Sequence, residues 1–141
     1  MASLNFGIFP GYCLFTCGFT VPEILSYLDK SSLSKEDNTW KDAVSTVADR
    51  ILKDNPPYQV DKIVSKDTSG KLKVYYILYI RDKFDFSDLS MCCLAHECLH
   101  LCQFYLPDIL DRNQEHECEA YLHTHLMTQA LSVLRGKAEK I

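Results

Sequence analysis

The sequence has no hydrophobic stretch long enough to cross a bilayer. The apolar run VYYILYI at residues 74–80 spans only seven residues, whereas a membrane-spanning helix needs about 20. The apolar N-terminal stretch is interrupted by Pro10 and Gly11 and has no positively charged flank, so it lacks the pattern of a secretory signal. We therefore expect a cytoplasmic protein that is not embedded in a membrane.

Blocks of basic residues, internal repeats and low-complexity segments are also absent. The formal net charge is −4, and lysines alternate with acidic residues along the chain. This composition does not predict binding to nucleic acid. With 141 residues, 47% of them hydrophobic, the chain is predicted to form one domain, residues 1–141, around its own core.

No CxxC pair occurs among the seven cysteines, which argues against a structural zinc site built from thiolates. An odd number of cysteines cannot pair completely within one chain, and free thiols are expected in a reducing compartment. We interpret the cysteines as small apolar packing residues. Two alternatives remain open: a structural zinc site of mixed cysteine and histidine ligands, and a hydrolase in which Cys98 acts as nucleophile beside a histidine.

The pattern of apolar residues predicts an α+β fold. Runs rich in aromatic and β-branched residues predict strands at 4–9, 12–18, 58–65 and 71–80. Three-and-four spacing with capping signals predicts helices at about 20–28, 34–54, 88–105 and 114–135. We expect a small, twisted, mainly antiparallel sheet of three or four strands with helices packed on it. The continuous run VYYILYI should be buried on both faces.

The segment HECLH at residues 96–100 has the spacing of a metal site. His96 and His100 lie one helical turn apart on one face, so both imidazoles can reach a single zinc ion. Glu97 is offset around the helix, where it can accept a proton from a water that the metal activates. The alternative is that these side chains are ordinary core or surface residues.

A third ligand is sought in EHECEAYLHTH at residues 115–125. Glu117 is our prediction, because it shares helical spacing with an apolar row of Ala120, Thr124, Met127, Leu131 and Leu134. Glu119 shares a second apolar row with Leu122, Leu126, Ala130 and Val133, so the spacing alone does not separate the two carboxylates. We interpret His123 and His125 as ordinary residues of a polar face.

These motifs resemble a known family. An apolar strand, LAHECLHL at 94–101 and HECEAYL at 116–122 together resemble zincin metallopeptidases with a glutamate ligand, the gluzincins. More narrowly, they resemble the small single-domain zincin-like proteins of phages and prophages. The resemblance covers about residues 72–130.

The resemblance implies a zincin-like fold in which the HECLH helix and the following helix lie side by side. It implies Zn²⁺ as cofactor, bound by His96, His100 and Glu117, with Glu97 as general base in the hydrolysis of a peptide or protein substrate. Tyr121 and Glu119 would support the ligands. Strand 72–80 would be the sheet edge that pairs with the substrate. The alternative function is a zincin-fold binding or inhibitor module with a structural zinc.

Overall fold

The computed structural model describes residues 1–7, 9, 11–30, 38–66, 69–70, 72–108 and 115–136. Its sheet contains β1 (Ala2–Asn5), β2 (Tyr12–Cys17), β3 (Tyr58–Lys66) and β4 (Leu72–Ile80), in the order β1-β2-β4-β3. β1 pairs with β2 and β3 with β4 in antiparallel fashion, whereas β2 and β4 are parallel. The prediction of an α+β fold is confirmed, with a four-stranded mixed sheet.

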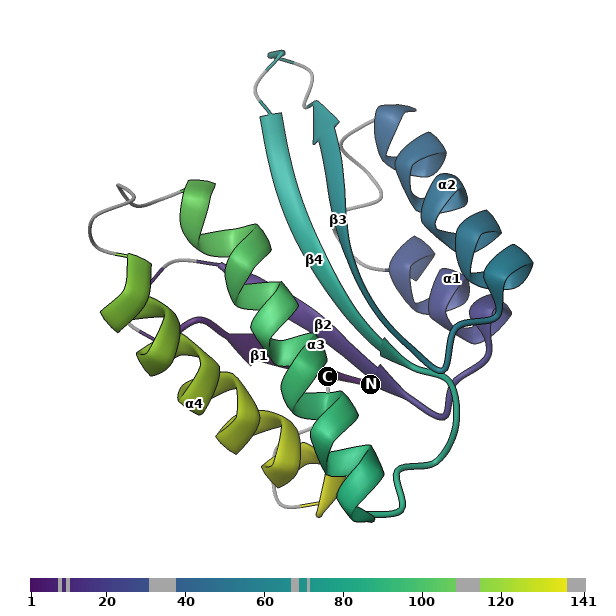
Figure 1. Cartoon of the computed structure of the whole chain (residues 1–141). Coiled ribbons are helices and arrows are strands. Elements are labelled where there is room, and N and C mark those ends of the chain that lie inside the picture. The colour runs from purple at the N-terminus through teal and green to yellow at the C-terminus, as the bar shows by residue number, and fades with distance from the viewer. Residues whose placement is uncertain are drawn as a thin grey trace.

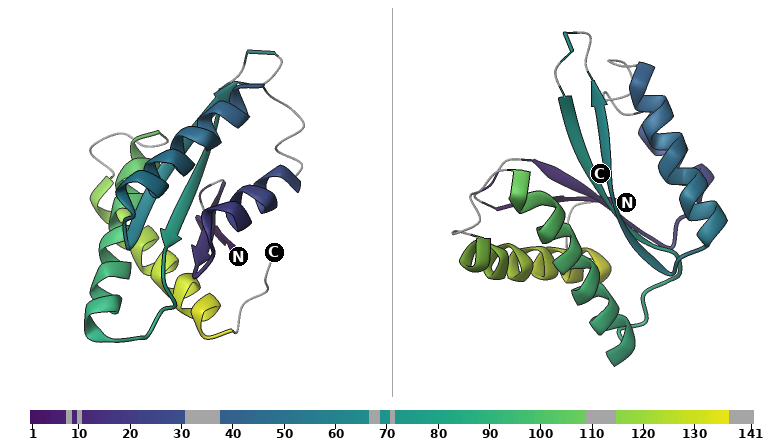
Figure 2. Two further views of the ribbon diagram at one scale, coloured as in Figure 1. Left: turned by 90° about the vertical axis from the view of Figure 1, so that its right-hand side faces the viewer. Right: turned by 45° about the horizontal axis from the view of Figure 1, so that its top comes forward.

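Helices cover both faces of this sheet, which makes three layers (Figures 1 and 2). Helices α1 (Val21–Lys30) and α2 (Asn38–Asp54) pack on one face. Helices α3 (Asp88–Tyr105) and α4 (Glu115–Leu134) pack on the other, and a short 3₁₀ helix, η2 (Leu106–Asp108), follows α3. The HECLH helix and the next helix therefore lie side by side, as the sequence predicted.

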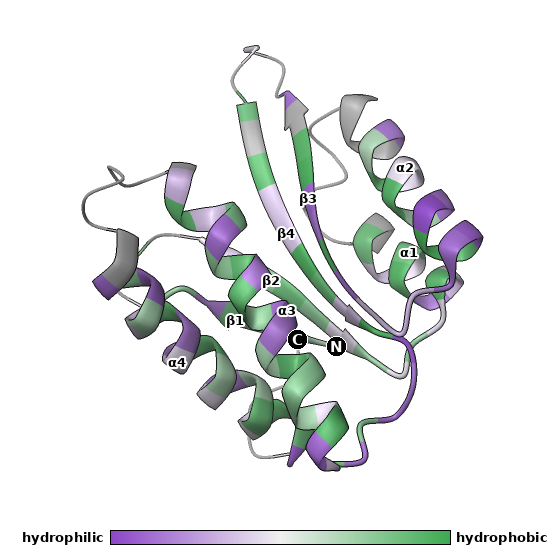
Figure 3. Cartoon of the chain, viewed as in Figure 1, coloured by the Kyte–Doolittle hydropathy of each residue, from purple (hydrophilic) through white to green (hydrophobic). Residues whose placement is uncertain are grey.

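Two separate cores hold the layers together. Alternate residues of β4 point to opposite faces, so Leu78 joins the core under α3 and α4, and Ile77 and Tyr79 join the core under α1 and α2. The residues Tyr76–Ile80 are all buried, which confirms the predicted burial on both faces for this part of the run 74–80. For the start of the run the prediction is wrong, because Val74 is exposed. Figure 3 shows that the solvent side of α2 carries hydrophilic residues.

The prediction that strand 72–80 forms a sheet edge is wrong. β4 lies between β2 and β3, and the edges of the sheet are β1 and β3. The reason is the parallel pairing of β4 with β2, which places Cys13 opposite Tyr76 and Cys17 opposite Ile80. β3 is therefore the edge strand that lies beside α3.

The outer edge of β1 is engaged by a side chain of α4. Gln129 accepts a hydrogen bond from the backbone N–H of Asn5 (3.1 Å) and donates one to the Asn5 carbonyl (2.8 Å). The amide thereby imitates the backbone of a neighbouring strand at this residue. This contact fixes α4 to the sheet and occupies part of the β1 edge.

Local signals define the beginnings of two helices. Thr20 and Glu23 form a capping box before α1: the Thr20 N–H donates to the Glu23 carboxylate (2.7 Å), and the Glu23 N–H donates to Thr20 Oγ1 (3.4 Å). Ser87 caps α3 by accepting from the Ser90 N–H (3.2 Å).

Among the described residues, no helix is both long and apolar enough to span a membrane.

Candidate functional site

His96 and His100 converge on one point at the surface of α3. Their Nε2 atoms are 2.9 Å apart and their rings are almost perpendicular, at 89°. A tetrahedral zinc ion about 2.0–2.1 Å from each nitrogen would hold them about 3.3 Å apart. The two imidazoles therefore need to separate by only a few tenths of an ångström to share an ion, and they fit as two of its ligands.

Two further α3 residues orient His100. Its Nδ1 lies 3.3 Å from Oε1 of Gln103, and its ring stacks on Phe104 with a centroid separation of 6.2 Å. In the tautomer that donates from Nδ1 to Gln103, the Nε2 lone pair is left for a metal. Sequence analysis did not identify Gln103 or Phe104, although their positions three and four residues after His100 place them on its side of the helix.

Glu97 lies beside the two histidines and is half-buried. Burial raises the pKa of its carboxyl group, and the nearby charges of His100 and His96 oppose that rise. A raised pKa makes a carboxylate a stronger base at neutral pH. The position and the electrostatics of Glu97 thus suit the acceptance of a proton from a water near the histidines.

Glu117 does not face α3, and the inward row that the sequence predicted for α4 is wrong. Glu117, Ala120 and Thr124 are exposed, whereas Leu122 and Leu126 of the second row are fully buried. Glu117 instead lines a shallow depression on the outer side of α4. The packing of Leu122 and Leu126 under α4 sets this rotation of the helix.

Glu119 faces α3 but lies on the wrong side of it. Burial raises the pKa of the Cys102 thiol to about 12, and the charge of Glu119 adds to this rise, so the carboxylate lies near Cys102. Residues of an α-helix follow one another at about 100°, which places Cys102 about 160° around α3 from His100. Neither carboxylate is therefore brought to the histidine pair.

The described residues do not complete a set of metal ligands. Within them, no three His, Cys, Asp or Glu side chains are grouped closely enough to hold a metal ion. Glu115 and His116, the other donors at the start of the EHECEAYLHTH segment, have side chains that lie outside the description. The structure thus brings together two histidines that could bind a metal and a carboxylate that could act as a base, and it places no third candidate ligand beside them among the described residues.

Tyr121 lies on the same outer side of α4 as Glu117. Its ring stacks on His125, with centroids 6.0 Å apart, and meets the edge of Phe9 at 6.3 Å. Gly7 approaches it so closely that a Cβ there would lie 2.6 Å from the phenol oxygen. The described contacts of Tyr121 therefore connect α4 with the segment after β1, and none of them reaches the histidine pair.

His123 and His125 both bind residues of other elements. His123 Nε2 lies 2.9 Å from the Ala95 carbonyl of α3, and His125 Nε2 lies 2.8 Å from Asn5 Oδ1. The first contact joins α4 to the residue that precedes His96. The interpretation of these histidines as ordinary residues of a polar face is therefore incomplete, because each joins α4 to a neighbouring element.

Three of the seven cysteines are buried packing residues, whereas Cys92 is exposed. All seven are free, and Cys13, Cys98 and Cys102 are buried in the core beneath α3 and α4. Burial raises the pKa of the Cys98 thiol to about 12. A nucleophilic cysteine needs a lowered pKa, so the environment of Cys98 argues against the thiol hydrolase.

We predict that alkylation of the native protein at pH 8 modifies Cys92 well before Cys98 and Cys102. Cys92 is exposed, whereas the two buried thiols hold little thiolate at that pH. Mass spectrometry of peptides after timed iodoacetamide treatment measures the order, and urea should make all the thiols react. Labelling of Cys98 as fast as Cys92 would contradict the packing described here.

Comparison with protein-family models, with curated proteins and with solved structures finds no match to this chain.

Proposed function

We propose that this chain is a zincin-like, zinc-dependent metallopeptidase in which His96 and His100 bind the ion and Glu97 is the general base. The observation that carries the proposal is the convergence of the two Nε2 atoms, 2.9 Å apart, beside a half-buried carboxylate. Packing alone gives no reason for a carboxylate to lie beside two converging histidines.

The chemistry follows from this arrangement. Held by His96 and His100, zinc would polarise a water and lower its pKa. The carboxylate of Glu97 would accept a proton from this water as the water oxygen adds to the peptide carbonyl, and would pass the proton to the amine nitrogen as the carbon–nitrogen bond breaks. The hydrogen bond between His100 and Gln103 holds the imidazole ring in place while the substrate reacts.

Glu117 is the third ligand that the resemblance implies, with Glu119 as the alternative. The packing of α4 directs Glu117 outward and Glu119 toward Cys102. The proposal therefore requires the first turns of α4 to shift when zinc binds. Glu117 lies two residues after the first residue of α4, within the part of the helix that would have to shift.

We propose that the substrate binds along β3. A peptide in extended conformation can add to a free sheet edge through backbone hydrogen bonds. β3 is the edge strand on the α3 side of the molecule, and a shallow depression runs between it and Gln103, Phe104 and Pro107. β3 therefore replaces strand 72–80 as the proposed substrate-binding edge, because strand 72–80 lies inside the sheet.

The test is the zinc content of the untagged protein, purified without chelators and measured by elemental mass spectrometry. We expect about one zinc per chain in the parent, none in His96→Ala, and loss in whichever of Glu117→Ala and Glu119→Ala removes the third ligand. His125→Ala, which removes a histidine from the outer side of α4, should retain the metal. A parent without zinc, or zinc that survives His96→Ala, would contradict the proposal.

A second candidate function is a binding or inhibitor module with a structural zinc. His96 and His100 would be two of the ligands of that zinc as well. This module would lose stability when zinc is removed and would cleave no peptide. Substitution of Glu97 separates the two functions, because only the metallopeptidase has a hydrolytic activity that Glu97→Gln can abolish.

A further inference from the structure

The hairpin of β3 and β4 extends beyond the end of α3 (Figures 1 and 2). Alternate residues share a face of a strand, so Val64, Leu72 and Val74 point to the same side as Val60 and Leu78, which pack under α3. Because α3 ends at Tyr105, the outer three residues are left 44%, 58% and 37% exposed, respectively. The hairpin thus presents an uncovered apolar surface.

Phe104 connects this surface with the histidine pair. Its side chain is 42% exposed, lines the depression beside β3 together with Val60 and Lys62, and stacks on His100. A peptide that lies along the hairpin would therefore continue toward His100. We call the surface formed by Lys62, Val64, Lys66, Leu72, Val74 and Phe104 the hairpin surface.

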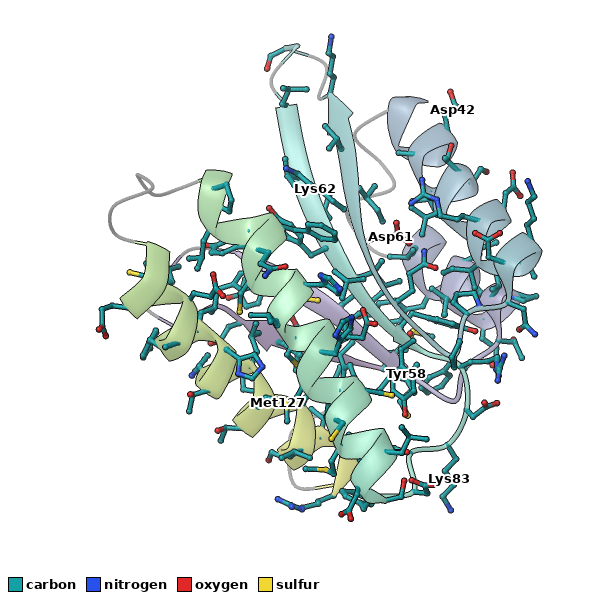
Figure 4. All side chains as sticks on the ribbon, viewed as in Figure 1. Asp42, Tyr58, Asp61, Lys62, Lys83 and Met127 are labelled. Carbon is teal, nitrogen blue, oxygen red and sulfur yellow. The ribbon has the colours of Figure 1, made fainter. Side chains whose placement is uncertain are left out.

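The charge of the hairpin surface is opposite to that of the whole chain. Lys62 and Lys66 flank Val64 on the α3 side of β3, although the formal net charge of the protein is −4. Asp61 points to the other side of the sheet, where it forms an ion pair with Arg50 of α2 (Figure 4). The α3 side of β3 is thus basic and apolar in alternation.

This alternation indicates the chemistry of the occupant. An added strand places its side chains directly opposite those of β3, and opposite charges at such positions are favourable. A strand with acidic residues facing Lys62 and Lys66 and an apolar residue facing Val64 would complement all three. A second, antiparallel copy of β3 in the register that places Val64 opposite Val64 would instead bring Lys62 opposite Lys66, which disfavours this self-pairing.

We infer that the hairpin surface binds an extended peptide segment in which acidic and apolar residues alternate. In the metallopeptidase proposed above, and resting on that proposal, this surface selects substrates with such a segment next to the bond to be cleaved. The binding itself depends only on β3, β4 and the end of α3.

The test measures binding separately from hydrolysis. A fluorescein-labelled peptide with three glutamate–valine repeats, and a matched peptide with lysine–valine repeats, are titrated with the Glu97→Gln protein and followed by fluorescence anisotropy. We expect the acidic peptide to bind at least tenfold more tightly. In Lys62→Glu/Lys66→Glu this preference should reverse, and Val64→Asp should weaken binding of the acidic peptide at least fivefold.

Lys53→Glu is the matched control, because it reverses an exposed lysine of α2 away from the hairpin surface. It should change the affinity less than twofold. Equal affinity for the two peptides, an equal effect of Lys53→Glu, or displacement of the acidic peptide by single-stranded RNA would overturn the inference. Hydrolysis by the parent without preference for acidic peptides would overturn this inference and leave the metallopeptidase proposal intact. Selective binding of the acidic peptide without hydrolysis by the parent would support this inference and contradict the metallopeptidase proposal.

Discussion

Glu97→Gln is expected to lower the rate of peptide hydrolysis by at least about 100-fold, within the range that general-base catalysis contributes. Glutamine has nearly the shape of glutamate but cannot accept a proton, so His96 and His100 should hold about one zinc as in the parent. Cleavage of a defined peptide pool, followed by liquid chromatography and mass spectrometry, measures the rate, and elemental analysis measures the zinc.

The same substitution at a distant carboxylate is the control. Glu23→Gln changes the capping box of α1, on the opposite face of the sheet, and should leave hydrolysis unchanged. Equal, measurable rates for the parent and Glu97→Gln would exclude Glu97 as the general base, whereas a parent that hydrolyses no peptide would favour the binding module.

The direction of the pH dependence of hydrolysis follows from the environment of Glu97. Because burial raises the pKa of Glu97, hydrolysis should fall as the pH drops through that raised value, since a protonated carboxyl group cannot act as a base.

Leu126→Ala is expected to lower the free energy of unfolding by about 2–5 kcal/mol, the usual cost of removing a fully buried leucine side chain. Leu126 is 0% exposed and lies in the core shared by α3, α4 and the sheet. Leu131→Ala is the matched control on the same helix, because Leu131 belongs to the outer row and is only partly buried. Urea denaturation of both variants gives the difference.

This comparison also tests the orientation of Glu117. Leu126 and Leu131 belong to the two apolar rows of α4 that the sequence could not separate. If Leu131→Ala proves the more costly substitution, α4 is rotated, and Glu117 faces α3 with the row of Leu131. The order predicted here, with Leu126→Ala more costly, places Glu117 outward and makes a shift of α4 necessary for it to bind zinc.

Features with local causes were predictable from the sequence. The capping residues Thr20 and Ser87 lie immediately before α1 and α3, and Gly136 follows the end of α4 with a positive φ of 71°. The burial of residues 76–80 on both faces was visible in their unbroken apolar character. The spacing of His96 and His100 was enough to predict that their nitrogens meet.

Features that depend on distant segments were not predictable. The position of β4 inside the sheet results from its pairing with β2, more than 50 residues earlier in the chain. The rotation of α4 results from a choice between two rows of similar apolar character, and the sheet and α3 decide it through Leu122 and Leu126. This choice governs Glu117 and Glu119, so the third ligand was the least secure part of the predicted site.

The two edges of the sheet differ in a way that bears on assembly. Gln129 satisfies the outward backbone groups of Asn5 on β1, whereas β3 ends the sheet on the other side without a further strand in the described chain. Growth of a filament by edge-to-edge addition needs two available edges on every molecule. Because Gln129 already bonds the backbone of Asn5, addition of a strand at β1 would have to displace this side chain. Addition at β3 meets no such contact of Gln129, so the two edges are not equivalent in edge-to-edge growth.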